Sequence, residues 1–124
     1  MERLNLQQKI AVMRILFDII NADGRIDARE TFYFKKVAKL LNISEEHLVS
    51  VNNANSLLSL LEINSFDEKQ KYQMIKMMGE QIVVDEDINV NEMAIYDLVC
   101  KTCNIDIKFE DVVDPETIEQ SSRS

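Results

Sequence analysis

Residues 21–30 read Asn-Ala-Asp-Gly-Arg-Ile-Asp-Ala-Arg-Glu, and residues 83–92 read Val-Val-Asp-Glu-Asp-Ile-Asn-Val-Asn-Glu. The two stretches correspond at a constant offset of 62 positions, which leads from 23 to 85 and from 30 to 92. The offset pairs these identical residues: Asp23/Asp85, Ile26/Ile88, Glu30/Glu92, Val37/Val99, Lys39/Lys101, Asn42/Asn104 and Ile43/Ile105. An internal repeat of this kind constrains the architecture and shows which positions share a role.

Apolar residues flank both stretches at intervals of three and four, the spacing of an amphipathic helix. The spacing predicts helices over about 5–21, 28–41, 44–52, 55–61 and 90–103, and one that runs from a capping box at 65–68 to about 83. The expected inward residues are Leu6, Ile10, Met13, Phe17 and Ile20, with Leu16 and Ile19 widening the stripe; Thr31, Phe34, Ala38 and Leu41, with Val37 beside them; Tyr72, Ile75, Met78 and Ile82; and Met93, Tyr96, Cys100 and Cys103.

Two helical hairpins bury their apolar faces most simply against each other. We therefore expect an all-α fold of six or seven helices, with two helix–acidic turn–helix repeats related by a pseudo-twofold axis. The repeats span about 9–43 and 71–105 within a single domain over 1–112, and residues 113–124 form a polar tail that we expect to fray. Within that tail, Asp114-Pro115-Glu116 is suited to begin one short helix.

The composition excludes several classes of protein. Only two glycines and one proline among 124 residues argue against a β-sandwich or barrel, which needs many turns. A net charge of −8 repels phosphate, so we expect no nucleic-acid partner and favour cations or basic protein surfaces. No apolar run reaches the length of a membrane span. The start, Met1-Glu2-Arg3-Leu4-Asn5, lacks the order of a secretory signal, and we expect a cytoplasmic protein.

The acids of the two stretches have two explanations. Asp27 with Glu30, and Asn89 with Glu92, have the spacing of capping boxes, which would leave the glutamates exposed at helix ends. Capping alone leaves other repeated acids unexplained, namely Asp23/Asp85, the charge-matched pair Asp18/Glu80, and Asp87. Acids gathered at one end of a hairpin repel each other, so the alternative is that they cap and also bind a cation.

Neither stretch is a complete calcium loop of the EF-hand type. Ile19 stands where the leading oxygen ligand would be, and Glu86 replaces the glycine in the second copy. Oxygen ligands without nitrogen or sulfur favour calcium or magnesium over zinc, at weak affinities of roughly 10⁻⁴–10⁻³ M. The candidate metal ligands are Asp18, Asp23, Asp27, Glu30, Glu80, Asp85, Asp87 and Glu92.

The first stretch resembles the hallmark of the tellurite-resistance TerB domain and its relatives, which include the N-terminal region of DnaJ-like membrane co-chaperones. That hallmark is an Ala-Asp-Gly-x-Ile-x-x-x-Glu turn, matched here by Ala22, Asp23, Gly24, Ile26 and Glu30. The second copy matches at Asp85, Ile88 and Glu92, and the resemblance covers about 6–106. It implies an all-helical, non-enzymatic module whose repeated acids bind a divalent metal and which serves stress-response or membrane-surface assemblies.

Other motifs favour structural roles. Cys100 and Cys103 correspond to Ala38 and Leu41 through the repeat, so we expect reduced, buried thiols rather than a redox pair or half of a zinc site. The methionines at 74, 77 and 78 are expected in the core, and no nucleophile–base pair or phosphate loop points to an enzyme.

Within the candidate set, Asp23, Asp27 and Glu30 are expected to contribute most of the binding, with Asp18 as an outer helper. The second copy supplies ligands either to a weaker twin site or to one shared site, if the symmetry axis brings the turns together. A cation-binding or basic-partner-binding module is therefore the leading hypothesis. The alternatives are a metal-free adaptor that binds proteins through an apolar groove and, more remotely, a one-metal hydrolase.

Overall fold

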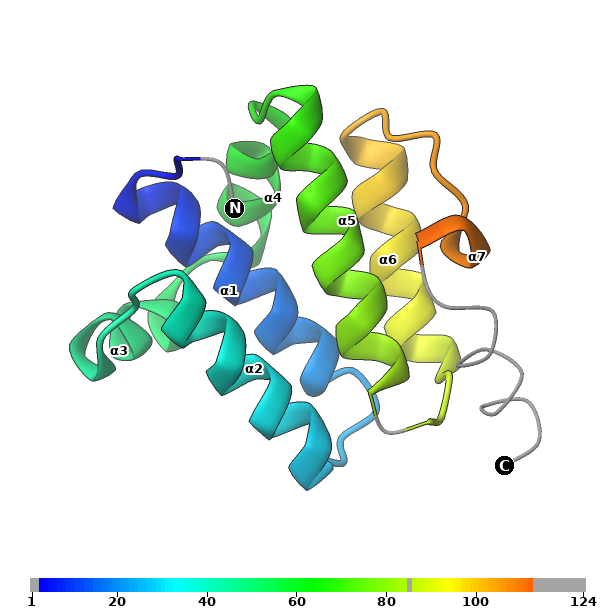
Figure 1. Cartoon of the computed structure of the whole chain (residues 1–124), viewed down its shortest axis with the longest axis horizontal. Coiled ribbons are helices and arrows are strands. Elements are labelled where there is room, and N and C mark those ends of the chain that lie inside the picture. The colour runs from blue at the N-terminus through cyan, green and yellow to red at the C-terminus, as the bar shows by residue number, and fades with distance from the viewer. Residues whose placement is uncertain (1–2, 85, 113–124) are drawn as a thin grey trace.

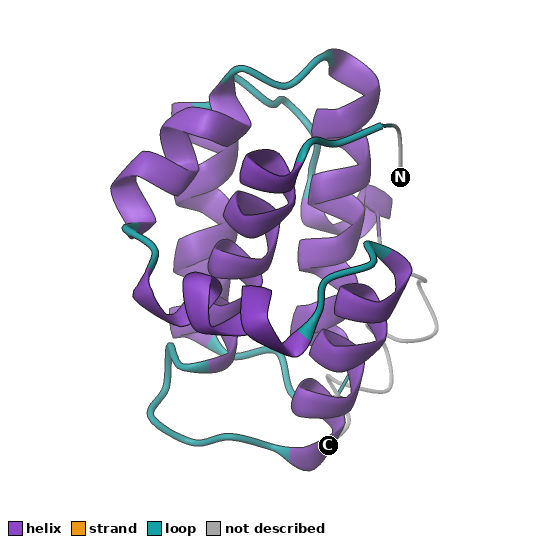
Figure 2. Ribbon diagram, turned by 90° about the vertical axis from the view of Figure 1, so that its left-hand side faces the viewer, coloured by secondary structure: helices purple, strands orange, loops and turns teal. Residues whose placement is uncertain are grey.

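The computed structural model describes residues 3–84 and 86–112. Figures 1 and 2 show that this part of the chain consists of helices and loops, which confirms the all-α prediction. The described residues form seven helices: α1 (Leu6–Ile20), α2 (Ala28–Leu40), α3 (Glu45–Asn53), α4 (Ser56–Asn64), α5 (Glu68–Val83), α6 (Val90–Thr102) and α7 (Phe109–Val112). The expected tail over 113–124 and its short helix lie outside the described residues. No helix in the described part has both the length and the apolar character to cross a bilayer.

Side-chain caps define where most helices begin. Asn5 and Ser44 accept hydrogen bonds from the third residue of α1 and α3, and both caps are reciprocated as complete capping boxes. The box predicted at Ser65 is wrong by two residues, because Asp67 caps α5 and pairs with Gln70. Ser65 instead ends α4, where its hydroxyl donates to the Glu62 carbonyl oxygen at 2.6 Å.

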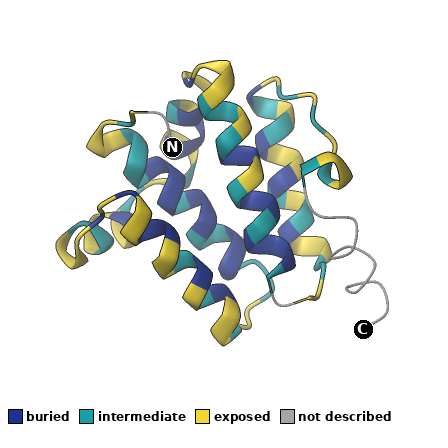
Figure 3. Ribbon diagram, in the orientation of Figure 1, coloured by how far each residue is buried: buried dark blue, intermediate teal, exposed yellow. Residues whose placement is uncertain are grey.

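Helix α1 forms the centre of the domain, in contact with every helix from α2 to α6. Its inner face is fully buried, as Figure 3 shows, and so is the facing side of α5. The apolar residues with no exposed surface are Val12, Met13, Leu16 and Ile19 on α1, and Met74, Ile75, Met78 and Ile82 on α5. Two such faces in contact remove enough apolar surface from water to be the main source of stability.

Three inward faces differ from the prediction. On α1, Leu6 is wrongly placed in the core, because it is 46% exposed. Tyr72 is wrongly placed in the core, because it is 49% exposed while Met74 takes the inward position on α5. On α2, Val37 is buried beside the expected face, and Tyr33, which was not expected inward, is more buried than the predicted Thr31 and Phe34. The α2 face follows from its contact with α5, where the Tyr33 hydroxyl donates to Glu80 Oε2 at 2.6 Å.

The ends of α2 and α6 have the same geometry at the same offset. Asn42 and Asn104 follow these helices with φ of 56° and 55°, the left-handed conformation that asparagine tolerates. The next residue in each case donates its N–H back into the helix at 2.8 Å, from Ile43 to the Ala38 carbonyl oxygen and from Ile105 to that of Cys100. The repeat is therefore visible in local backbone geometry, while the pseudo-twofold axis stays a prediction.

Both cysteines are free thiols, and they differ in exposure. Cys103 has no exposed surface and its thiol donates to the Leu60 carbonyl oxygen at 3.8 Å, whereas Cys100 is half-buried. Burial raises the pKa of the Cys100 thiol to about 11 and also raises the pKa of Cys103. Since the thiolate is the reactive form, both side chains should react slowly.

Thiol labelling at pH 8 tests this packing. Only about one Cys100 thiol in a thousand is ionised at that pH, so native protein should label far more slowly than unfolded protein, and Cys100 should react before Cys103. A Cys100→Ser variant isolates Cys103. If Cys103 in that folded variant labels as fast as in denaturant, its burial is contradicted.

Candidate functional site

The turn after α1 and the turn after α5 lie together at one end of the helices (Figure 1). A cavity of about 320 Å³ opens between them, lined by Asp23, Arg25, Ile26, Asp27, Arg29 and Glu30 from the first turn and helix start, and by Asp87 from the second turn. The amide of Asn89 also crosses between the turns, with Nδ2 donating to Asp23 Oδ2 at 3.4 Å. Candidate ligands 64 positions apart in sequence, Asp23 and Asp87, thus face one space.

Both turns contain a residue in the left-handed conformation at the same repeat position. Gly24 has φ of 76° and Glu86 has φ of 62°. The loss of the second glycine therefore has not changed the backbone conformation at this point. A residue with a Cβ is strained in this region, so the second turn keeps its shape at a cost that the first turn avoids.

Both oxygens of the Asp23 carboxylate accept hydrogen bonds, one within the first turn and one from the second. Oδ1 accepts from the backbone N–H of Arg25 at 3.0 Å, which closes the turn around Gly24. Oδ2 accepts the bond from Asn89 described above. An asparagine at position 23 could keep the Oδ1 contact, so the charge can be removed with little change to the turn.

Asp27 and Asn89 cap α2 and α6, as predicted. Asp27 Oδ1 accepts from the Arg29 backbone N–H at 2.7 Å, and Asn89 Oδ1 accepts from Asn91 and Glu92 at 2.7 and 3.3 Å. The Arg29 guanidinium also pairs with Asp27, Nε lying 3.1 Å from Oδ1. Hydrogen bonds from the Arg29 side chain and backbone lower the pKa of Asp27, which keeps this carboxylate ionised near the cavity.

The glutamates three positions after the caps are not exposed, contrary to the prediction. Glu30 is 2% exposed and Glu92 is 1% exposed. They occupy equivalent places at the start of α2 and α6, where the positive end of the helix dipole favours a carboxylate. Both glutamates are therefore buried at the start of a helix, and Glu30 also lines the cavity.

Gln81 is a buried polar residue that sequence reasoning missed. It has no exposed surface, and its Nε2 donates to the Glu30 carbonyl oxygen at 3.1 Å. Its Oε1 is buried and accepts no hydrogen bond within the described residues. Its place one residue before Ile82, on the inward side of α5, was the available signal, since inward glutamine is uncommon without a structural or binding role.

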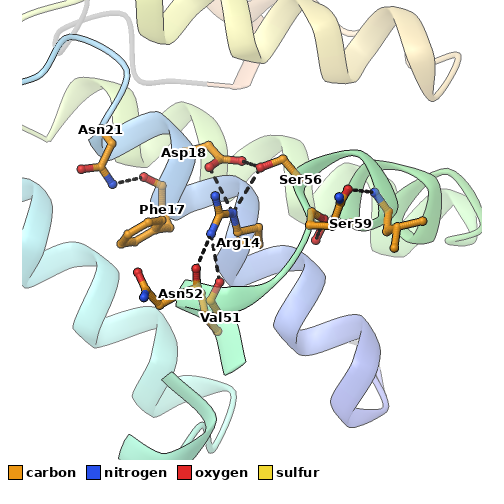
Figure 4. Close-up of polar contacts among 10 residues, drawn as sticks. Arg14, Phe17, Asp18, Asn21, Val51, Asn52, Ser56 and Ser59 are labelled. Carbon is orange, nitrogen blue, oxygen red and sulfur yellow. Dashed lines mark hydrogen bonds and ion pairs between the residues drawn. The ribbon is translucent and has the colours of Figure 1, made fainter. Parts of the chain in front are cut away.

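Asp18 and Glu80 do not line the cavity. Asp18 pairs with Arg14 Nε at 3.2 Å and accepts from the Ser56 hydroxyl at 2.7 Å, and Arg14 in turn donates to the Val51 and Asn52 carbonyl oxygens (Figure 4). This network joins α1 to the end of α3 and the start of α4. Glu80 accepts from Tyr33, as described above, and burial together with Glu80 raises the pKa of that phenol.

The remaining predicted ligands are partly brought together. Asp23, Asp27, Glu30 and Asp87 share the cavity, and Glu92 is buried at the start of α6. Asp85 lies outside the described residues. Within 3–84 and 86–112, no three histidine, cysteine, aspartate or glutamate side chains are close enough to enclose a bare metal ion. Any ion held by these acids would keep part of its water shell.

Comparison with known proteins agrees with the resemblance seen in the sequence. The family described as tellurite resistance protein TerB matches residues 1–53, which span α1, the first turn, α2 and α3. A crystal structure of PG1108, a protein of unknown function from Porphyromonas gingivalis W83, is similar with a TM-score of 0.73 at 20% identity, and 100% of each chain is covered. At that identity the likeness shows the fold alone. No curated protein matches the chain. Together the findings support a TerB-like helical domain.

The left-handed conformation at Gly24 and Glu86 predicts opposite effects of substitution on stability at these two positions. Gly24→Ala should destabilise the protein by about 1 kcal/mol through backbone strain alone, since nothing lies within 4 Å of the added Cβ. Glu86→Gly should stabilise it by up to about 1 kcal/mol. Urea unfolding measures both. Glu86→Ala is the control, because it removes the carboxylate and keeps the backbone strain. If Glu86→Ala stabilises the protein as much as Glu86→Gly does, strain at position 86 is contradicted.

Proposed function

We propose that this TerB-like domain is a non-catalytic binding module that takes up a hydrated divalent cation in the cavity between its two turns. The observation that supports this most is the lining of one cavity by acids from both copies of the repeat, Asp23, Asp27 and Glu30 with Asp87. The resemblance to tellurite-resistance proteins extends the proposal to a role in a cytoplasmic stress response.

The charge of the cavity favours a cation. Four carboxylates and two guanidinium groups line it, so the lining has a net formal charge of −2. Arg29 already pairs with Asp27, whereas Asp23 and Asp87 extend from opposite turns. A divalent cation would offset the repulsion between acids that the fold holds side by side.

The size and donor set of the cavity favour a weakly held ion with water around it. A volume of about 320 Å³ accommodates on the order of ten water molecules, far more than a bare ion requires. Magnesium keeps several of its waters when it binds protein carboxylates, and calcium accepts water among its oxygen ligands. We therefore expect calcium or magnesium to bind in the high-micromolar to millimolar range.

The same lining supports a role without catalysis. The side chains around the cavity are carboxylates, guanidinium groups and one isoleucine, and they include no hydroxyl, thiol or imidazole nucleophile. Asp27 is held in its ionised form by Arg29, which suits binding a cation better than transferring a proton.

Calorimetric titration with calcium, magnesium, manganese and zinc tests the proposal. Wild-type protein should show saturable binding of calcium or magnesium, and Asp23→Asn should abolish it while leaving the urea midpoint nearly unchanged. Asp97→Asn, which removes an exposed acid from α6, is the matched control and should bind as the wild type does. If Asp23→Asn keeps wild-type affinity, or if the wild type binds none of the four ions, the proposal fails. The acids then serve as caps or contact a basic partner.

Arg29→Gln provides a test in the opposite direction. One positive charge about 8 Å from a divalent ion in water repels that ion by about 1 kcal/mol. Without the Arg29 charge, the affinity for the cation should therefore rise roughly fivefold. The measurement is the same titration, repeated at 0.5 M salt, where the gain should shrink because the charges are screened. Unchanged or weakened cation binding in Arg29→Gln at low salt would contradict an electrostatic site at this cavity.

A further inference from the structure

A second concave surface lies between α2 and α5, beside the carboxyl end of α2. The groove has a volume of about 250 Å³, and its apolar lining consists of Val37, Leu40, Leu41 and Met77. Lys76 and Glu80 line it from the α5 side. The cation cavity is at the opposite end of α2, where Glu30 stands, so the two surfaces are separate.

The two helices that form the groove also carry exposed apolar side chains. Leu40 is 73% exposed, and so is Phe32 two helical turns earlier on the same outward face of α2. On α5, Tyr72 is exposed one turn before Lys76. These large apolar side chains contact water in the isolated chain. A partner that covered them would remove apolar surface from water, which favours binding.

The charges around the groove are opposite in sign to the chain as a whole. Arg29 and Glu30 line the cavity at the other end of α2, and Lys71 donates to the Cys103 carbonyl oxygen at 3.0 Å. The remaining charged residues of α2 and α5 are five lysines and two glutamates, a net of +3, in a chain whose net charge is −8. The lysines with exposed side chains are Lys35, Lys36 and Lys39 on α2, and Lys69 and Lys76 on α5. A partner for this face should therefore be acidic as well as apolar.

Polar contacts hold the two walls of the groove in place. Tyr33 and Glu80 join α2 to α5 at 2.6 Å, and Gln81 reaches the Glu30 carbonyl oxygen at 3.1 Å. The walls are therefore formed before any partner arrives, which reduces the ordering cost of binding. A concave space between two helices also matches the ridge of a third helix better than it matches a flat lipid surface.

We propose that the groove between α2 and α5 binds an acidic amphipathic helix of a partner protein. The apolar ridge of that helix packs on Leu40, Met77 and Val37, and its flanking carboxylates pair with Lys36, Lys39 and Lys76. Recognition of this kind uses apolar anchors at intervals of three and four residues on the partner, with charge setting orientation and specificity. The proposal goes beyond the cation site and does not depend on it.

The test uses a fluorescent synthetic peptide of about 15 residues, or four helical turns, with leucine at every third or fourth position and glutamate elsewhere. Fluorescence anisotropy should show saturable binding to the wild-type chain. Leu40→Glu and Lys76→Glu should each weaken binding by about tenfold or more, the effect of losing one anchor of an interface. Leu57→Glu, at an exposed leucine on α4, is the matched control and should bind as the wild type does.

The other outcomes each overturn the proposal. Equal binding by wild type and Leu40→Glu, or no binding by wild type, would exclude the groove as a site for an acidic helix. The same peptide with lysine in place of glutamate should not bind, and equal binding by it would remove the charge argument. Sedimentation with phosphatidylglycerol vesicles that is lost in Leu40→Glu would assign the face to membranes. Dimerisation lost in Leu40→Glu, measured by sedimentation velocity, would assign it to a second copy.

Discussion

The contact between α1 and α5 is the constraint on which the rest of the structure depends. These are the first helices of the two repeats, and both bury an apolar face completely against the same core. Because the turns that follow them meet, the two helices run in the same general direction, and their acidic ends cannot separate without exposing that core. The apolar periodicity of the sequence thus forces together carboxylates that would otherwise repel each other.

The buried glutamates show the cost of that arrangement most clearly. A carboxylate loses hydration when it is buried and needs compensation from donors, cations or helix ends. Glu30 and Glu92 both lie at helix starts, where the positive end of the helix dipole supplies part of that compensation. The repeat conserves these positions between its two copies more strictly than it conserves the turn glycine. Capping alone does not require this burial, because an exposed side chain would also provide a cap.

Much of the fold could be predicted from the sequence because its signals are local. The spacing of apolar residues at intervals of three and four placed the long helices to within a few residues. The asparagines at 42 and 104 follow the ends of their helices at equivalent positions, as the repeat implies. The inward face of α2, the burial of Glu30 and Glu92 and the position of Gln81 were missed, since each depends on contacts between distant segments. Asp18 and Glu80 were assigned to the site by charge alone. Instead, the hydroxyl groups of Ser56 on α4 and Tyr33 on α2 donate hydrogen bonds to these two carboxylates. Charge pattern identified the turns but could not show which acids face one space.

The proposed cation site requires that the two turns act as a single site. Manganese is the direct probe, because its unpaired electrons broaden the NMR signals of nearby backbone amides. During a titration, the amides of residues 23–30 and 86–92 should broaden together at the same manganese concentration, while those of α3 stay sharp. Broadening confined to one turn, or spread evenly over the acidic surface of the chain, would contradict a shared site.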